Sequence, residues 1–128
     1  MQSKPEMHLY EYALVRYVPL VEREEFVNVG LIMMCKRRRW IRVELHIDGP
    51  RILALHPGAD LDALGSQLES FRLISSGKES PIGALDVHER FRWLTAVRSA
   101  CLSTSRPHPG RSADLDVTFD RLFRELVL

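Results

Sequence analysis

The chain has 128 residues, of which 45% are hydrophobic, and 18 basic against 17 acidic residues give it a net charge of +1. This length and apolar content suit one globular domain and exclude a wholly disordered chain, and the near-neutral charge gives no overall attraction to nucleic acid or an acidic membrane. No apolar run approaches the ~20 residues of a membrane helix, and neither Cys35 nor Cys101 belongs to a CxxC pair. We therefore expect one cytoplasmic domain over residues 1–128, with residues 1–7 disordered, reduced cysteines and no membrane partner.

The first part of the chain predicts three strands. The first runs from Leu9 to Val18 and ends before Pro19, which lacks a backbone N–H donor. A charged loop leads to the second strand, Glu25 to Cys35, and a turn of four cations leads to the third, Trp40 to Ile47. The third strand alternates apolar and polar residues, which is typical of a strand with one buried face.

The rest of the chain predicts two main helices and a short one. Asp60 is a suitable N-cap for a helix whose apolar stripe ends before Gly77, and Asp114 is a suitable N-cap for a last helix of the same kind. A short helix fits Val87 to Leu94, and a fourth strand fits Arg98 to Thr104.

Two segments are less regular. RILAL at 51–55 fits either a short strand or a helical turn, and SRPHPGRS at 105–112 is predicted as a loop because it holds two prolines and a glycine. The order of all these elements indicates an α+β fold. It consists of an antiparallel sheet of about four strands, with two main helices packed on one face and a short third helix.

Arg16, Asn28 and Gly30 interrupt two strands that are otherwise apolar. In a hairpin that pairs Val18 with Phe26, Arg16 lies opposite Asn28. Strand parity also predicts one wholly apolar face of the second strand, which meets the helices and holds Val27, Val29, Leu31, Met33 and Cys35.

A second register extends the polar face to the third strand. If Cys35 pairs with Ile41, then Gly30 lies opposite His46, and Glu44 falls on the same face. The glycine then leaves room for a small anion or polar ligand, bound by the guanidinium and amide of the first hairpin and the imidazole of the third strand. The alternative that stays open is a plain solvent face on which Gly30 marks a β-bulge.

The turn between the second and third strands is a candidate nucleic-acid site. Arg37, Arg38 and Arg39 follow Lys36 and are placed to contact phosphates, and Trp40 beside them is placed to stack on a base. A charged turn on a protein of neutral net charge is the more frequent explanation.

Arg90, Arg92 and Arg98 lie within nine residues of one another, close to Trp93. They form either an anion site or ion pairs with the chain's carboxylates, and ion pairs are the more frequent outcome. The five histidines lack metal-ligand spacing, and the chain has no P-loop, GxGxxG or GxSxG motif. We expect no metal, no cofactor and no recognisable catalytic motif.

Five segments together resemble the bacterial domain-of-unknown-function family 3037. They are YALVRYVP at 12–19, EFVNVGLIM at 25–33, ERFRWLTAVRS at 89–99, the His108-Pro109-Gly110 loop, and DRLFRELV at 120–127. The chain departs from the family at Glu24, where members tend to have glycine. The resemblance implies functional positions at Arg16, Glu25, Phe26, Asn28, Gly30, Arg90, Phe91, Arg92, Trp93 and His108.

The resemblance also implies a partner, because family members tend to be encoded beside a HipA-like kinase. The leading hypothesis is a non-enzymatic interaction or regulatory module that partners such a kinase, as in a toxin–antitoxin pair, through its arginine and asparagine face or a sheet edge. The alternative is a small phosphate-, nucleotide- or nucleic-acid-directed binding protein or enzyme. As an enzyme it requires Arg16, Arg92 and His108 to converge, because acid–base groups act within hydrogen-bond reach.

Overall fold

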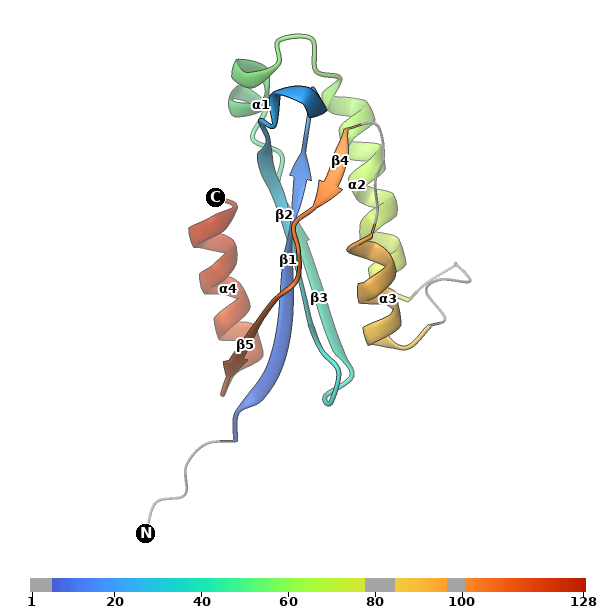
Figure 1. Cartoon of the computed structure of the whole chain (residues 1–128), viewed down its shortest axis with the longest axis vertical. Helices are drawn as coiled ribbons and strands as arrows, with labels where there is room; N and C mark the ends of the chain where they lie inside the picture. The colour runs from blue at the N-terminus through green and yellow to red at the C-terminus, as the bar shows by residue number, and fades with distance from the viewer. Residues whose placement is uncertain (1–5, 78–84, 97–100) are drawn as a thin grey trace.

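The computed structural model describes residues 6–77, 85–96 and 101–128 (Figure 1). Most of the disorder predicted at 1–7 and the predicted strand start at Arg98 lie outside the described residues. In chain order the elements are β1 (His8–Tyr17), η1 (Val21–Arg23), β2 (Val27–Cys35), β3 (Trp40–Leu45), α1 (Gly49–Leu55), α2 (Leu61–Ser75), α3 (Val87–Leu94), β4 (Leu102–Thr104), β5 (His108–Ser112) and α4 (Leu115–Leu126).

The antiparallel sheet confirms the α+β class and has five strands. Its order is β3-β2-β1-β4, and β5 also pairs with β1. The two short strands share one edge of β1, since β4 pairs with Val15–Tyr17 and β5 pairs with His8–Tyr12. The loop predicted at 105–112 is therefore wrong over residues 108–112. Pro109 is tolerated there because β5 is an outer strand, where a missing N–H need not break a ladder.

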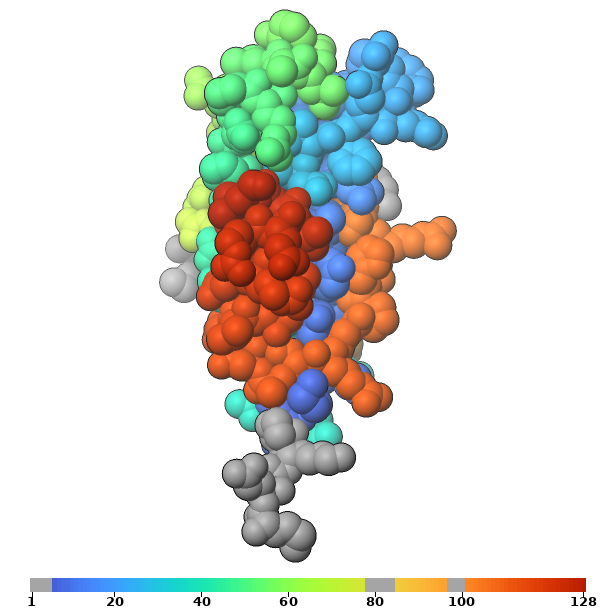
Figure 2. Space-filling model, turned by 90° about the vertical axis from the view of Figure 1, so that its left-hand side faces the viewer, coloured from blue at the N-terminus to red at the C-terminus, as the bar shows by residue number. Residues whose placement is uncertain are grey.

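Helices cover both faces of the sheet, which differs from the single covered face expected from the sequence. The helices α1, α2 and α3 pack on one face, where the buried residues include Ile32 and Phe91. The helix α4 packs on the opposite face, where Leu31 and Phe119 are fully buried, and it dominates the view onto that face (Figure 2). The strand β2 is apolar over most of its length, as strands covered on both faces are, and this was the sequence signal for the second helical layer.

A β-bulge at Val29 explains how β2 supplies both cores. Arg16 pairs with Asn28 and Val15 pairs with Gly30, so Val29 has no pairing partner on β1. One extra residue shifts the alternation of side chains beyond it. The predicted common face is therefore wrong: Val27 and Val29 belong to the core under α1–α3, whereas Leu31, Met33 and Cys35 belong to the core under α4.

The helices follow the sequence signals closely. The carboxylates of Asp60 and Asp114 cap α2 and α4 by accepting from the backbone N–H three residues on, at 3.0 and 3.1 Å. Gly77 follows α2 with a φ of 80°, and α3 spans the predicted residues. The ambiguous segment at 51–55 belongs to α1. None of the described helices is long and apolar enough to cross a membrane.

Candidate functional site

Arg16 and Asn28 form a polar pair on the sheet face that α4 covers. They lie opposite each other on β1 and β2, as the first hairpin register predicted. The Asn28 amide Nδ2 donates a hydrogen bond of 3.0 Å to the Leu126 carbonyl in the last turn of α4. The guanidinium carbon of Arg16 lies 4.1 Å from the ring centroid of Phe26, a side chain that is 45% exposed. We call Arg16, Phe26 and Asn28 the Arg16–Phe26 surface.

The charge of Arg16 is not matched by a carboxylate among the described residues. Its Nε and the Asn28 Oδ1 are both buried without a hydrogen-bond partner in the described part of the chain. The guanidinium instead lies over the Phe26 ring, which is a favourable cation–π arrangement. A cation fixed on a half-exposed ring can bind an acidic or polar group while the ring enters an apolar recess.

Gly30 does not create the predicted polar notch, because it faces the opposite core. A Cβ at this position meets Leu45 Cδ2 at 2.5 Å, the Glu44 carbonyl oxygen at 3.0 Å and Val15 Cβ at 3.3 Å. The predicted register is also wrong by one residue, since Gly30 pairs with Leu45 rather than with His46. The slip arises at the turn, where Cys35 pairs with the residue directly after the four cations.

His46 lies in a different environment from the one predicted. It is exposed just beyond β3 and lines a shallow hollow that includes Glu69 and Arg72 of α2. A hydrogen bond from Arg72 lowers the pKa of Glu69. Glu44 also lines this hollow, and its carboxylate lies 3.6 Å from the Arg42 guanidinium. His46 therefore stands beside an ion pair of α2 and not beside Arg16.

The arginines of α3 make contacts within the protein. Arg90 donates to the carbonyl oxygens of Ser75 at 2.7 Å and Leu85 at 3.0 Å, and thus joins the end of α2 to the start of α3. Arg92 forms an ion pair of 2.9 Å with Glu11 of β1. Arg98 lies outside the described residues.

The two remaining interaction candidates lie at separate places on the surface. Trp93 is 42% exposed and lines an apolar hollow of about 260 Å³ between α2 and α3. Glu25 lies just before β2 and pairs with Arg23 of η1. Neither side chain belongs to the Arg16–Phe26 surface.

The convergence of Arg16, Arg92 and His108 that an enzyme requires is not present. Arg92 contacts Glu11, which is on the face of β1 toward α3, whereas Arg16 is on the face toward α4. His108 is exposed opposite Tyr12, with ring centroids 5.2 Å apart. Tyr12 and Arg16 are four residues apart on one strand, which is about 13 Å. This geometry contradicts a joint acid–base site.

A family model decides what the chain is related to, because residues 12–127 match the family described as protein of unknown function, DUF3037. The chain belongs to the DUF3037 family. No curated protein and no solved structure matches the chain. Position 24, where the resemblance places glycine in other DUF3037 members, has a φ of 55°. This left-handed conformation favours glycine, so the departure at Glu24 carries local backbone strain.

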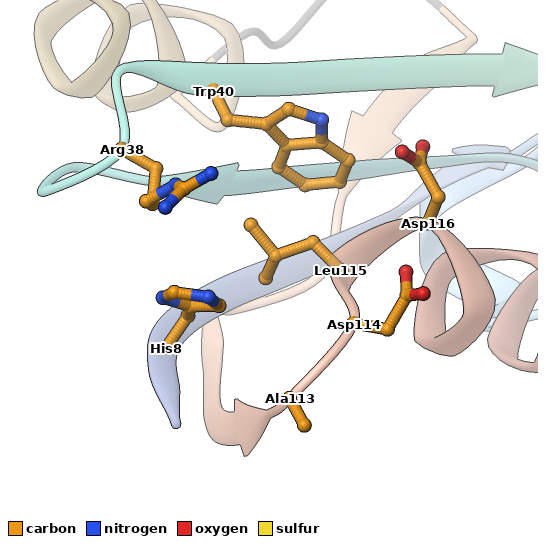
Figure 3. Close-up of a pocket in the computed structure, with 7 residues that line it drawn as sticks. All are labelled: His8, Arg38, Trp40, Ala113, Asp114, Leu115 and Asp116. Atoms are coloured by element: carbon orange, nitrogen blue, oxygen red, sulfur yellow. The ribbon is translucent and has the colours of Figure 1, made fainter. Parts of the chain in front are cut away.

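The DUF3037 match includes the β2–β3 turn, where the structure forms a pocket that the sequence reasoning did not find. The pocket has a volume of about 250 Å³ and combines Arg38 and Trp40 with His8 and Leu115 (Figure 3). Residues so distant in sequence give no local motif, so only the pairing of the strands brings them together. Three or more His, Cys, Asp or Glu side chains do not cluster as metal ligands anywhere in the described ranges.

Proposed function

We propose that this DUF3037 protein is a cytoplasmic, non-enzymatic interaction module that binds a protein partner through the Arg16–Phe26 surface. One observation carries the proposal: the Arg16 guanidinium has no carboxylate partner among the described residues and lies 4.1 Å from the ring centroid of a half-exposed phenylalanine. Arginine and aromatic side chains are enriched among the residues that dominate protein–protein affinity.

The arrangement favours binding because much of the ordering is already present. Arg16 is held on one side by the Phe26 ring, and Asn28 is fixed by its bond to Leu126 at the end of α4. A partner that covers this surface therefore loses less side-chain entropy than one that must order a free arginine. A carboxylate on the partner would form an ion pair with Arg16 and neutralise its charge.

The partner class that we propose is a HipA-like kinase, because the family resemblance associates DUF3037 members with such a kinase. The role would be regulatory, with this chain restraining the kinase in the manner of an antitoxin. Support for this identity comes from the resemblance, whereas support for the binding surface comes from the contacts of Arg16.

The test is to measure the affinity of the purified chain for a purified HipA-like kinase. We expect Phe26→Ala to weaken the complex by about 2 kcal/mol, which is roughly 30-fold in Kd. The matched control is Val117→Ala on α4, because this side chain is also apolar and is 64% exposed. Circular dichroism must show that both variants are folded.

Three results would overturn parts of the proposal. If the kinase forms no complex with the chain and keeps its activity in the presence of the chain, a HipA-like kinase is excluded as the partner. An equal loss of affinity in the two variants removes the Arg16–Phe26 surface. A complex unaffected by Phe26→Ala and also by Arg16→Gln removes that surface as well.

A further inference from the structure

The β2–β3 turn carries an unneutralised positive charge at the opposite end of the sheet from the Arg16–Phe26 surface (Figure 1). It consists of Lys36, Arg37, Arg38 and Arg39, which are all exposed. None of the four forms an ion pair with any residue that the structure describes. Although the net charge of the chain is only +1, this end of the sheet is therefore strongly cationic.

A pocket of about 250 Å³ lies beside this turn on the α4 side (Figure 3). Arg38 and His8 project at one end of it, and the Trp40 indole and Leu115 form an apolar wall. Trp40 is held in place by an edge-to-face contact with Phe119, with ring centroids 6.4 Å apart. The pocket thus offers a fixed aromatic surface next to two basic groups.

The two carboxylates of this pocket are already engaged. Asp114 caps α4 by accepting from the Val117 N–H at 3.1 Å, and Asp116 accepts from the Arg42 guanidinium at 3.0 Å. Arg38 has no such partner in the described ranges. These contacts hold both carboxylates at the α4 end of the pocket, so the group free to contact an anion is Arg38 at the turn end.

A second hollow, of about 550 Å³, lies against the same turn and shares His8 with the first pocket. Lys36, Arg37 and Arg39 line it together with Leu9, so the cations of the turn serve both hollows. Its one carboxylate, Asp86, caps α3 by accepting from a backbone N–H at 2.8 Å. Both hollows therefore present basic groups beside apolar side chains.

We infer that this end of the molecule binds single-stranded nucleic acid. Phosphates contact the arginines along the turn, and one base stacks on Trp40 inside the smaller pocket. Cations that line two hollows suit a polyanion that passes the turn better than one small anion. The flat indole distinguishes a base from the aliphatic side chains of an acidic peptide, and a base is free to stack only where it is not paired.

The test is fluorescence anisotropy of a labelled oligothymidylate with the full chain over a range of salt concentrations. We expect Arg37→Ala/Arg38→Ala to weaken binding at least about tenfold at low salt, and to reduce the slope of log Kd against log salt by about 1.4, which is about 0.7 for each lost phosphate contact. The control variant, Arg121→Ala/Arg124→Ala, removes the same charge from the exposed side of α4. We expect it to change Kd less than about twofold.

A second measurement isolates the pocket. In a Trp93→Phe background, Trp40 is the remaining tryptophan, and we expect oligothymidylate to quench its fluorescence. Absence of binding at low salt, or equal losses in the two double variants, overturns the site. If polyglutamate binds more tightly than oligothymidylate, the turn binds an acidic protein instead, and the nucleic-acid site is also overturned. If the chain binds a duplex of the same length as tightly as oligothymidylate, and Trp40 fluorescence is not quenched, base stacking on Trp40 is overturned.

Discussion

At the scale of single residues, Gly30 shows why a glycine in a strand can serve the fold rather than a ligand. The approach of β3 leaves no room for a side chain, because a Cβ at position 30 meets both Leu45 and the backbone oxygen of Glu44. A side chain can rotate away, but a carbonyl moves only if its strand moves. The glycine therefore permits close packing of β2 against β3 at the bulge.

We predict that Gly30→Ala destabilises the protein by about 1–3 kcal/mol, because the added methyl overpacks this contact. Urea unfolding measures the effect. The matched control is Gly65→Ala in α2, where a Cβ meets Ile47 Cδ1 at an ordinary 3.8 Å. There the better helix propensity of alanine should stabilise by up to about 1 kcal/mol. Equal effects of the two substitutions would contradict the packing explanation for Gly30.

Tyr17 gives a prediction at alkaline pH. Burial raises the pKa of its phenol above 10.0, and a Cys101 thiolate nearby raises this pKa further. Above about pH 10 the unfolded chain ionises Tyr17 while the folded chain keeps its proton, so the stabilisation present below that pH is lost as the pH rises. We expect Tyr17→Phe to lose less stability than the unsubstituted chain between about pH 9 and about pH 11 in urea unfolding. Parallel losses in both proteins would show that Tyr17 does not contribute.

The residue-scale predictions from the sequence were right beside the β1–β2 turn and wrong beside the β2–β3 turn. Arg16 lies opposite Asn28 because their hairpin has the predicted register at that position. Gly30 and His46 do not meet, because the β2–β3 turn pairs Cys35 with Trp40 rather than with Ile41. One slipped residue at the β2–β3 turn reverses which side chains share a face.

At the scale of elements, Arg90 acts as a clamp between two helices. Its guanidinium reaches the Ser75 carbonyl at the end of α2 and the Leu85 carbonyl before α3. The Ser75 carbonyl ends α2 without a partner in that helix, and the Leu85 carbonyl lies just before the N-cap of α3, so one charged donor satisfies both. The importance that the resemblance gave to Arg90 is thus explained by structure.

We predict that Arg90→Ala lowers the free energy of unfolding by about 1.5–3 kcal/mol, because two charge-assisted hydrogen bonds are lost. Arg92→Ala is the control two residues away. Its ion pair with Glu11 is solvent-exposed, and such pairs contribute less than about 1 kcal/mol. Thermal or urea unfolding compares the two variants. A larger loss for Arg92→Ala would contradict the clamp and favour a buried role for the Glu11 pair.

The elements that the sequence predicted well are those with local signals. The helices α2, α3 and α4 have capping carboxylates and apolar stripes, so their positions follow from a few residues each. β5 has neither signal, because its proline and glycine are turn residues in most settings and its pairing with β1 joins segments about 100 residues apart. The bulge at Val29 had one local signal, the neighbouring Gly30, which was the alternative left open in the sequence analysis.

At the scale of the whole molecule, the two proposed binding sites lie at opposite ends of the sheet. The Arg16–Phe26 surface is at the start of β2 and the cationic turn is at its end, and nine residues of strand separate them by about 30 Å. One continuous strand, with residues buried in both cores, connects the two sites. The two ends therefore differ in chemistry, with an arginine on an aromatic ring at one and a run of four cations at the other.

We predict that the two sites act independently and form a ternary complex. Saturating oligothymidylate should change the Kd for the HipA-like kinase by less than about twofold, and the effects of Phe26→Ala and Arg37→Ala/Arg38→Ala should add within about 0.5 kcal/mol, as distant substitutions do. Analytical ultracentrifugation detects the ternary complex, and titration calorimetry measures both affinities.

A kinase that displaces the oligonucleotide would instead mean that its footprint extends the length of β2. Because a direct steric overlap of that size requires a large interface, the same experiment would also be expected to show losses of kinase affinity in both variants.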